Sequence, residues 1–353
     1  MEKLYQVFDG HNDTILKLEI AARRSNPIDF SQTSNDLDID LIKARNSGFL
    51  GGFFAMFTPS DLDFSKIEFD LNDPRNFLPI SQQEALNFTL SMFSRMHRLA
   101  NQFSDHLTIC HDVISIRKTM SQGKIAIVPH VEGAECIDEN FEVLQVLYAA
   151  GLRSLGLVWS RANAFAQGAP MGYQPKLDPG IGLSELGFEL VSECNRLGIL
   201  IDVSHLSEAG FWDVARTSKK PLIATHSNAY AISQTPRNLT DQQLVAIAES
   251  SGVAGLNFHV GFLNPKCDPH RDASILDILN HLEHMLKILG EDGVAIGSDF
   301  DGCVLPSTIG DVSGLPKFTK AMEEAQFGKD LIKKICSENW LSVMEKSLKK
   351  PTD

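Results

Sequence analysis

The chain has 353 residues, of which 43% are hydrophobic and 22% are charged, and its formal net charge is −13 at pH 7. This composition excludes wholesale disorder and collagen-like structure, and so acidic a chain lacks the basic face that a general nucleic-acid binder needs. Because no stretch approaches the ~20 apolar residues of a membrane span and no apolar signal region opens the chain, we expect a soluble, cytoplasmic protein with no membrane partner.

Short apolar runs with high β propensity recur along the chain, and several end in polar or glycine-rich residues. The predicted strands lie at residues 5–9, 49–57, 125–131, 154–159, 199–204, 222–225, 253–258 and 294–298. Several of them are continuously apolar, which is typical of parallel strands that are covered on both faces.

Amphipathic stretches with helical periodicity lie between several of these runs. A capping-box pattern at Ser81 opens a helix that runs to about Asn101, Ser184 opens a second that ends at Gly198, and a third covers residues 273–289. Residues 61–79 and 167–179 are expected to be long loops. Strand and helix alternating over residues 1–353 predict a single (β/α)8 TIM-type barrel domain, with an open doubly wound sheet as the alternative.

Polar side chains follow the predicted strands. They are His11 and Asp13 after the first, His130 and Glu132 after the third, Trp159 after the fourth, His205 after the fifth, His226 after the sixth, His259 after the seventh, and Asp299 and Asp301 after the eighth. In a barrel the carboxyl ends of all strands converge on one mouth, where the active site lies. We therefore expect these scattered residues to form one cluster.

Five members of this expected cluster are suited to binding metal ions, namely His11, Asp13, Glu132, His205 and His226. They are enough for two zinc-class ions if one carboxylate bridges them. Glu132 is the natural bridge, since it lies between a His–Asp pair and a His–His pair. A water between two such ions has a pKa low enough to be a nucleophile near neutral pH, so the pattern predicts hydrolysis.

Three other histidines are left out of this metal set. His130 lies two residues before Glu132 and is a candidate neighbour of the ligands rather than a ligand. Residues 281–284, which read His-Leu-Glu-His, match neither spacing of the metalloprotease helices. His281 and His284 are therefore expected to be solvated positions on an amphipathic helix.

Several sequence blocks resemble the motifs of the membrane (renal) dipeptidase family of zinc peptidases. The blocks are DGHNDT at 9–14, VEG at 131–133, NRLG at 195–198, IDVSH at 201–205, ATHSNA at 224–229, PRNL at 236–239 and GSDFDG at 297–302. They keep the order of the family and span residues 9–302, so the chain resembles a soluble, bacterial-type member. The resemblance implies a metal-dependent hydrolase barrel with a binuclear zinc centre that hydrolyses dipeptides.

The resemblance also assigns roles to single residues. His11 and Asp13 would hold one zinc, His205 and His226 the other, and Glu132 would bridge them, although manganese or iron would suit the same donors.

Two further roles follow from the same resemblance. Arg237 matches the arginine that engages the substrate carboxylate, a task for a planar bidentate donor. Asp299 matches the aspartate that transfers a proton from the bridging water to the departing nitrogen. The family also makes a C-terminal D-residue in the substrate and a homodimeric assembly reasonable expectations.

Trp159 is the clear departure from the family pattern. Better-known members carry a histidine here, which polarises the scissile carbonyl, and an indole N–H can donate a hydrogen bond but cannot carry the positive charge of an imidazolium. Rate or substrate range is therefore expected to differ, with Arg161 or Asn163 as candidate replacement donors. His259 lies near the position of a pocket-lining tyrosine of the family and is a candidate substrate contact.

Two alternatives to a dipeptidase stay open on the sequence alone. The same metal site would serve an amidohydrolase that acts on another small amide, such as an N-acyl amino acid, a lactam or a lactone. A non-catalytic binding protein would keep the fold and the metal while Trp159 blocks the pocket.

Overall fold

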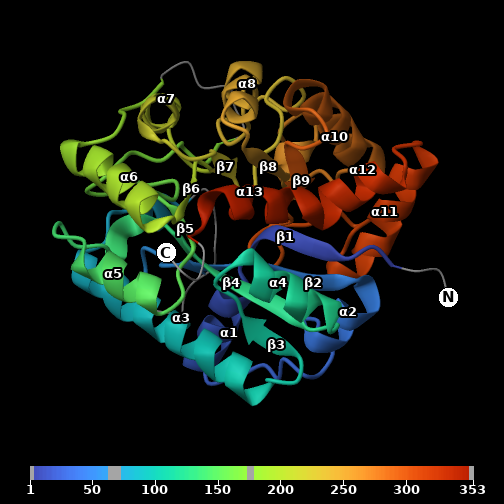
Figure 1. Cartoon of the computed structure of the whole chain (residues 1–353), viewed down its shortest axis with the longest axis horizontal. Coiled ribbons are helices and arrows are strands. Elements are labelled where there is room, and N and C mark those ends of the chain that lie inside the picture. Colours follow the sequence, from blue (N-terminus) through green and yellow to red (C-terminus); the bar gives the residue numbers. More distant parts are fainter. Residues whose placement is uncertain (1–3, 63–72, 173–178, 350–353) are drawn as a thin grey trace.

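The computed structural model describes residues 4–62, 73–172 and 179–349 (Figure 1). Residues 63–72, within the predicted loop at 61–79, and residues 173–178, within the predicted loop at 167–179, lie outside this described part. Within it, no helix is both long enough and apolar enough to cross a membrane.

The described strands form one parallel sheet whose order follows the chain. They are β1 (Val7–Asn12), β2 (Phe49–Phe57), β3 (Leu107–Ile109), β4 (Ile125–Glu132), β5 (Ser154–Gly156), β6 (Leu200–Asp202), β7 (Ile223–Ala224), β8 (Val253–Leu256) and β9 (Val294–Ile296). The neighbours run β1-β2-β4-β5-β6-β7-β8-β9, and β3 pairs with β4 outside this path. Such an order lacks the reversal that marks a doubly wound sheet.

The first and last strands meet and close the sheet into a ring. A parallel bridge joins Asn12 to Phe300. Beside it, the N–H of Asp13 donates to the carbonyl of Phe300 at 2.8 Å, and the N–H of Asp299 donates to the carbonyl of His11 at 3.0 Å. The predicted (β/α)8 barrel is therefore confirmed, and the open doubly wound alternative is wrong.

Helices surround this ring of strands (Figure 1). The α-helices are α1 (Thr14–Arg23), α2 (Leu41–Ser47), α3 (Gln82–Gln102), α4 (Val113–Ser121), α5 (Glu142–Ala149), α6 (Glu185–Leu197), α7 (Glu208–Thr217), α8 (Asp241–Glu249), α9 (Val260–Leu263), α10 (Ile275–Leu289), α11 (Leu315–Glu324), α12 (Lys329–Lys333) and α13 (Asn339–Ser347). Shorter turns of 3₁₀ helix are η1 (Pro74–Phe77), η2 (Ala134–Cys136) and η3 (Val312–Gly314), and η4 (Lys334–Glu338) is a turn of π-helix.

The helix ends follow from local sequence chemistry, as predicted. Ser81 and Glu84 form the capping box of α3, in which each side chain bonds the backbone of the other residue. The Ser184 hydroxyl accepts from the Gly187 N–H at the start of α6, and Gly198 ends this helix in the left-handed conformation with φ of 79°. These caps set where each helix returns toward the sheet.

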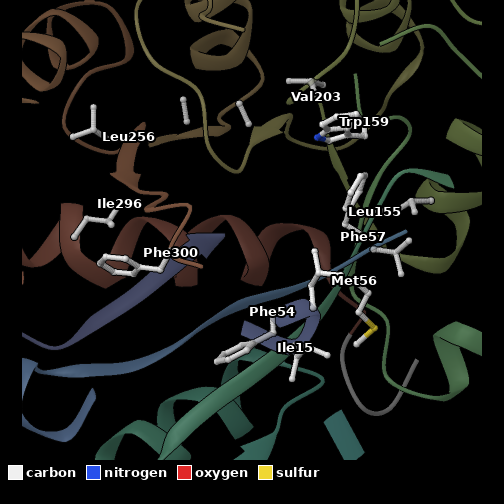
Figure 2. Packing of buried hydrophobic residues seen from close by; sticks show 14 of the residues in the cluster. Ile15, Phe54, Met56, Phe57, Leu155, Trp159, Val203, Leu256, Ile296 and Phe300 are labelled. Atoms are coloured by element: carbon white, nitrogen blue, oxygen red, sulfur yellow. The ribbon is translucent and has the colours of Figure 1, made fainter. Parts of the chain in front are cut away.

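Apolar side chains fill both faces of the strands. One cluster lies between the sheet and the helices, and Figure 2 shows part of it, including Phe54, Leu155 and Phe300. Inside the ring, Phe53 meets Phe8 and Trp340 edge-on, each at a ring-centroid distance of 5.5 Å. Because Trp340 enters from α13, the interior is a packed core rather than a pore.

Candidate metal centre and active site

The carboxyl ends of β1, β4, β6 and β7 bring all five predicted metal ligands to one buried point. The Nε2 atom of His205 lies 2.9 Å from Oε1 of Glu132, and that of His226 lies 3.6 Å from the same oxygen. The Nε2 atom of His11 lies 3.4 Å from Oδ2 of Asp13 and 3.8 Å from Oε2 of Glu132. The two oxygens of Glu132 therefore face different histidine groups.

Metal-suited atoms also converge in two overlapping sets. Within each set the candidate ligand atoms lie within 4.8 Å of one another, and the sets are His11 with Glu132 and His226, and His11 with Asp13 and Asp299. His11 belongs to both, so the two sets are contiguous rather than separate sites.

The bonding of these buried atoms fits a metal centre. Both ring nitrogens of His11 and Oδ1 of Asp13 have no hydrogen-bond partner within the described chain. His205 and His226 direct their Nε2 atoms at each other across 2.9 Å. Unpaired buried polar atoms are costly, and imidazole nitrogens with carboxylate oxygens are the donors that zinc-class ions prefer. The residues present therefore fit such ions.

The pKa values of the clustered residues also fit a metal centre. Burial lowers the pKa of His205 and of His226 well below the usual range, which leaves neutral imidazoles, the form that binds metal ions. Burial raises the pKa of Glu132 to about 8. Burial alone would lower the pKa of His11, but the carboxylates of Glu132 and Asp13 outweigh it and raise this pKa to about 10. The cluster therefore favours positive charge at its centre.

A buried carboxylate orients one of these histidines. Oδ1 of Asp202 accepts from the N–H groups of Ser204 and Thr225, each at 2.9 Å, and its Oδ2 accepts from the Thr225 hydroxyl at 2.6 Å. The same hydroxyl oxygen lies 2.8 Å from Nδ1 of His226. Asp202 thus links the ends of β6 and β7 and holds the imidazole ring of His226.

Left-handed backbone places three side chains at the mouth. His205, Asp299 and Asp301 have φ of 66°, 63° and 67°. Such angles are uncommon outside glycine, although His and Asp tolerate them better than most residues, and they gather at functional sites. The turn after Asp299 also needs Gly302, because a Cβ there would lie 2.2 Å from Oδ2 of Asp13.

Asp299 lies beside the cluster and is held by Asn257, whose Nδ2 donates to its Oδ2 at 3.0 Å. Burial raises the pKa of Asp299 to about 6, against the opposing effects of His11, Asn257 and Arg237. A carboxyl group with a pKa close to neutrality can both accept and release a proton.

A cavity of ≈ 430 Å³ opens over this cluster. Every predicted site residue except His11 lines it, namely Asp13, Glu132, Trp159, His205, His226, Arg237, His259 and Asp299. His11 lies in β1 and is fully buried. The cavity volume falls in the range of sites for small molecules.

Arg237 and His259 form one side of the cavity, with Phe262. Arg237 is buried, its Nε has no hydrogen-bond partner among the described residues, and burial lowers its pKa to about 10, so it stays cationic at neutral pH. The His259 ring packs on Phe262 with centroids 4.5 Å apart, and burial lowers its pKa to about 4, so it is neutral. This side of the cavity therefore offers one buried cation.

The two candidate replacement donors after β5 do not reach the cavity. Nδ2 of Asn163 donates to the carbonyl of Leu157 at 2.8 Å, and its Oδ1 accepts from the N–H of Phe165 at 2.9 Å. Nε of Arg161 donates to Oε1 of Glu135 at 2.8 Å, and Arg161 is not among the residues that line the cavity. The expectation that either supplies a donor to the cavity is therefore wrong, and Trp159 is the residue of this segment that lines it.

The histidines left out of the metal set do not all lie where the sequence predicts. Nδ1 of His130 lies 2.9 Å from the Ser154 hydroxyl, and its ring meets that of His11 edge-on at 5.4 Å, so it is a neighbour of the ligands. His281 is fully buried, contrary to the expectation of a solvated position. Its Nδ1 accepts from the Ala229 N–H at 3.1 Å, so it fixes the loop that follows β7.

The sequence reasoning also missed two residues, Asp202 and Asn257. Each is a polar residue in or directly after an otherwise apolar strand. Polar groups at such positions are nearly always hydrogen-bonded, and this is the signal that would have singled them out.

A parallel barrel with a buried imidazole and carboxylate cluster at its mouth defines the class of metal-dependent hydrolase barrels. A model of the membrane dipeptidase family (peptidase family M19) matches residues 1–352, and the chain belongs to this family. It is an enzyme of the metallopeptidase class.

Three proteins are similar to this chain over most of its length. A metallopeptidase from Rhodobacter sphaeroides, whose crystal structure is liganded with a phosphinate mimic of the dipeptide L-Ala-D-Ala, is 39% identical with a TM-score of 0.90, covering 98% of this chain and 100% of that chain. A Klebsiella pneumoniae protein named only by its position in the pqqA 5′ region is 40% identical over 250 residues, 71% of this chain and 92% of its own. The probable dipeptidase PvdM from Pseudomonas aeruginosa is 21% identical with a TM-score of 0.82, covering 97% of this chain and 95% of its own, and shares the fold.

Proposed function

We propose that this enzyme is a zinc-dependent dipeptidase in which His11, Asp13, Glu132, His205 and His226 hold two metal ions. The observation that carries the proposal is the position of Glu132, with Oε1 toward His205 and Oε2 toward His11. Manganese or iron would suit the same donors. When bound, such ions supply Lewis acidity that polarises a peptide carbonyl and lowers the pKa of a water molecule.

Arg237 is proposed to bind the terminal carboxylate of the substrate. Its buried guanidinium has an unused Nε, and its planar array of donors matches a carboxylate. Capture of a free carboxylate close to the scissile bond would restrict the substrate to short peptides. His259 and Trp159 are proposed as further contacts, since both line the same cavity.

Asp299 is proposed to carry the proton. Its carboxylate lies beside His11 and Asp13, and Asn257 occupies its Oδ2. Asp299 would take a proton from the attacking water and deliver it to the departing nitrogen, which then leaves as an amine.

The substrate class is proposed to include dipeptides with a C-terminal D-residue. The Rhodobacter sphaeroides structure with the L-Ala-D-Ala mimic supports this extension. A homodimer and a cytoplasmic location complete the proposal, to be checked by light scattering and by cell fractionation.

The direct test is hydrolysis of a dipeptide panel, with L- and D-residues at the C-terminal position, before chelation, after chelation and after adding back zinc. Zinc-dependent release of free amino acids is the expected result. Metal retention without turnover of any dipeptide in the panel would contradict the proposed substrate class.

Arg237→Met separates a dipeptidase from an enzyme that cleaves other small amides. We expect it to lower kcat/KM at least ~30-fold on dipeptides, as loss of a buried charge pair predicts, and to leave hydrolysis of carboxylate-free amides unchanged. Arg216→Met is the matched control, because Arg216 pairs with Asp213 at the surface. Equal losses on both kinds of substrate would contradict carboxylate recognition.

A further inference from the structure

Behind the cavity wall, Arg161 holds three chain segments together. Its side chain is fully buried, and Nε donates to Oε1 of Glu135 at 2.8 Å. Nη1 donates to the Ser60 hydroxyl at 3.0 Å, and Nη2 donates to the carbonyl of Thr58 at 2.6 Å. The acceptors follow β2 and β4, whereas Arg161 follows β5. One guanidinium therefore fixes the ends of three neighbouring strands.

The same guanidinium supports two aromatic residues that line the cavity. Its Cζ lies 5.2 Å from the ring centroid of Phe57 and 5.9 Å from that of Trp159. These two rings lie 4.9 Å apart, side by side in Figure 2, and Trp159 also stacks on Phe77 at 5.2 Å with an interplanar angle of 7°. Stacking and cation–π contacts hold both rings in place before any ligand binds.

The rings form an apolar wall next to the candidate metal centre, with 6.1 Å between the ring centroids of Trp159 and His205. Elsewhere the cavity is lined by charged residues, among them Arg237, Asp299, Lys17 and Asp301. In the proposed function, Arg237 binds the terminal carboxylate of the substrate and Asp299 transfers the proton, so neither group is available to contact an apolar side chain. The wall is then left to meet a side chain of the substrate, and a flat apolar surface favours aromatic or large apolar groups.

We propose that Arg161 is a positioning residue that fixes the Phe57–Trp159 wall, and that this wall selects dipeptides carrying an aromatic or large apolar side chain. The proposal rests on the proposed dipeptidase function. Arg161 itself does not line the cavity, so it acts on selectivity only through the wall.

The test compares kcat/KM for L-Phe-D-Ala and L-Ala-D-Phe with kcat/KM for L-Ala-D-Ala. The wild type is expected to prefer one of the phenylalanine substrates at least ~10-fold, in line with the transfer free energy of a large apolar group. Arg161→Met is expected to reduce that ratio to ~2 or less without changing zinc content. Because a ratio does not depend on the fraction of folded enzyme, a merely structural defect would leave it unchanged.

Three further variants complete the test. Arg161→Lys keeps a positive charge that can pair with Glu135 but loses the planar guanidinium and its several donors. We therefore expect a kcat/KM ratio between those of the wild type and Arg161→Met. Arg117→Met removes an arginine that pairs with Glu338 through two hydrogen bonds at the surface, and should leave the ratio unchanged. If Arg161→Met does not fold, Trp159→Leu removes the wall and leaves the buried ion pair intact. Absence of a phenylalanine preference in the wild type, or an unchanged ratio in Arg161→Met and Trp159→Leu, would overturn the proposal.

Binding of free amino acids separates failure of this proposal from failure of the dipeptidase function. If no dipeptide is hydrolysed, calorimetry with phenylalanine and alanine tests the wall alone. Tighter binding of phenylalanine by the wild type, lost in Trp159→Leu, would support the wall although the proposed reaction had failed. Equal binding of both amino acids would overturn it.

Discussion

Asp202 and Thr225 determine which ring nitrogen of His226 carries the lone pair. The Asp202 carboxylate can only accept hydrogen bonds, so the hydroxyl hydrogen of Thr225 is committed to it at 2.6 Å. Thr225 Oγ1 can then only accept from Nδ1–H of His226, at 2.8 Å. The lone pair of the imidazole is thereby placed on Nε2, the atom that faces Glu132.

Asp202→Asn should reverse the direction of the two hydrogen bonds that link residue 202, Thr225 and His226, a chain that we call the relay. The new amide would donate to Thr225 Oγ1, the hydroxyl hydrogen would turn to Nδ1 of His226, and the ring proton would move to Nε2. We expect zinc binding to weaken ~10- to 100-fold, measured by competition with a chelator. Thr225→Val removes the relay without reversing it and should cost less. Unchanged zinc affinity in Asp202→Asn would contradict the assigned orientation.

Glu132→Gln should disable the metal centre as a whole. An amide cannot bind two cations as a carboxylate does, so we expect fewer than two zinc ions per chain and a loss of kcat of at least ~100-fold. Elemental analysis of the purified variant and steady-state kinetics measure the two effects. Glu193→Gln, at a surface glutamate that pairs with Arg196, should match the wild type in both. Full zinc content in Glu132→Gln would argue against a bridging role.

Asn257→Asp should impair proton transfer by Asp299. The variant places a second carboxylate about where Asn257 Nδ2 now donates at 3.0 Å, which removes the hydrogen bond and adds like-charge repulsion. We expect kcat to fall at least ~10-fold while KM changes little. Asn257→Leu, which removes the donor and adds no charge, should have a smaller effect. An equal effect of both variants would assign Asn257 to packing rather than to the charge of Asp299.

His281 should make the stability of the fold depend on pH. Burial lowers the pKa of His281 to about 4, below the usual 6.5, so the unfolded chain takes up this proton first as the pH falls. Stability from this group is complete above pH 6.5 and is lost progressively toward pH 4, by up to about 3 kcal/mol.

His281→Asn is the variant that tests this pH dependence by thermal denaturation between pH 4 and 7.5. It should lower Tm at neutral pH but flatten the decline of Tm on acidification. His284→Asn, three residues further along α10 and paired with Asp241 near the surface, is the control. The same slope in His281→Asn as in the wild type would show that other groups dominate.

The strand positions could be predicted from the sequence because buried parallel strands are continuous apolar runs. β2 has the predicted bounds, 49–57, whereas the predicted strand at 154–159 ends at Gly156 in β5. After Gly156 the chain no longer pairs with the neighbouring strands, and Trp159 lines the cavity. The missed strand β3 has three residues, Leu107–Ile109, too few to show a period.

The candidate ligands could be predicted because each follows a strand directly, so their meeting point depends only on the barrel. The supporting residues could not. Asp202 acts on a histidine of the next strand, and Arg161 acts on Thr58 and Glu135, which are distant in sequence. Their roles depend on side-chain geometry across strands, which no spacing along the chain encodes.

The bridge between Asn12 and Phe300 implies that the proposed metal ions also have a role in stabilising the fold. During synthesis the strand that carries His11 emerges long before its neighbour β9, so the mouth is complete only when nearly the whole chain has left the ribosome. In the proposed centre, one ion held by His11 and Asp13 and one held by His205 and His226, with Glu132 between them, would tie together segments far apart in sequence, as a disulfide that closes a long loop does. Losing those ions would therefore loosen the entire barrel, and their uptake would mark a chain that has finished folding.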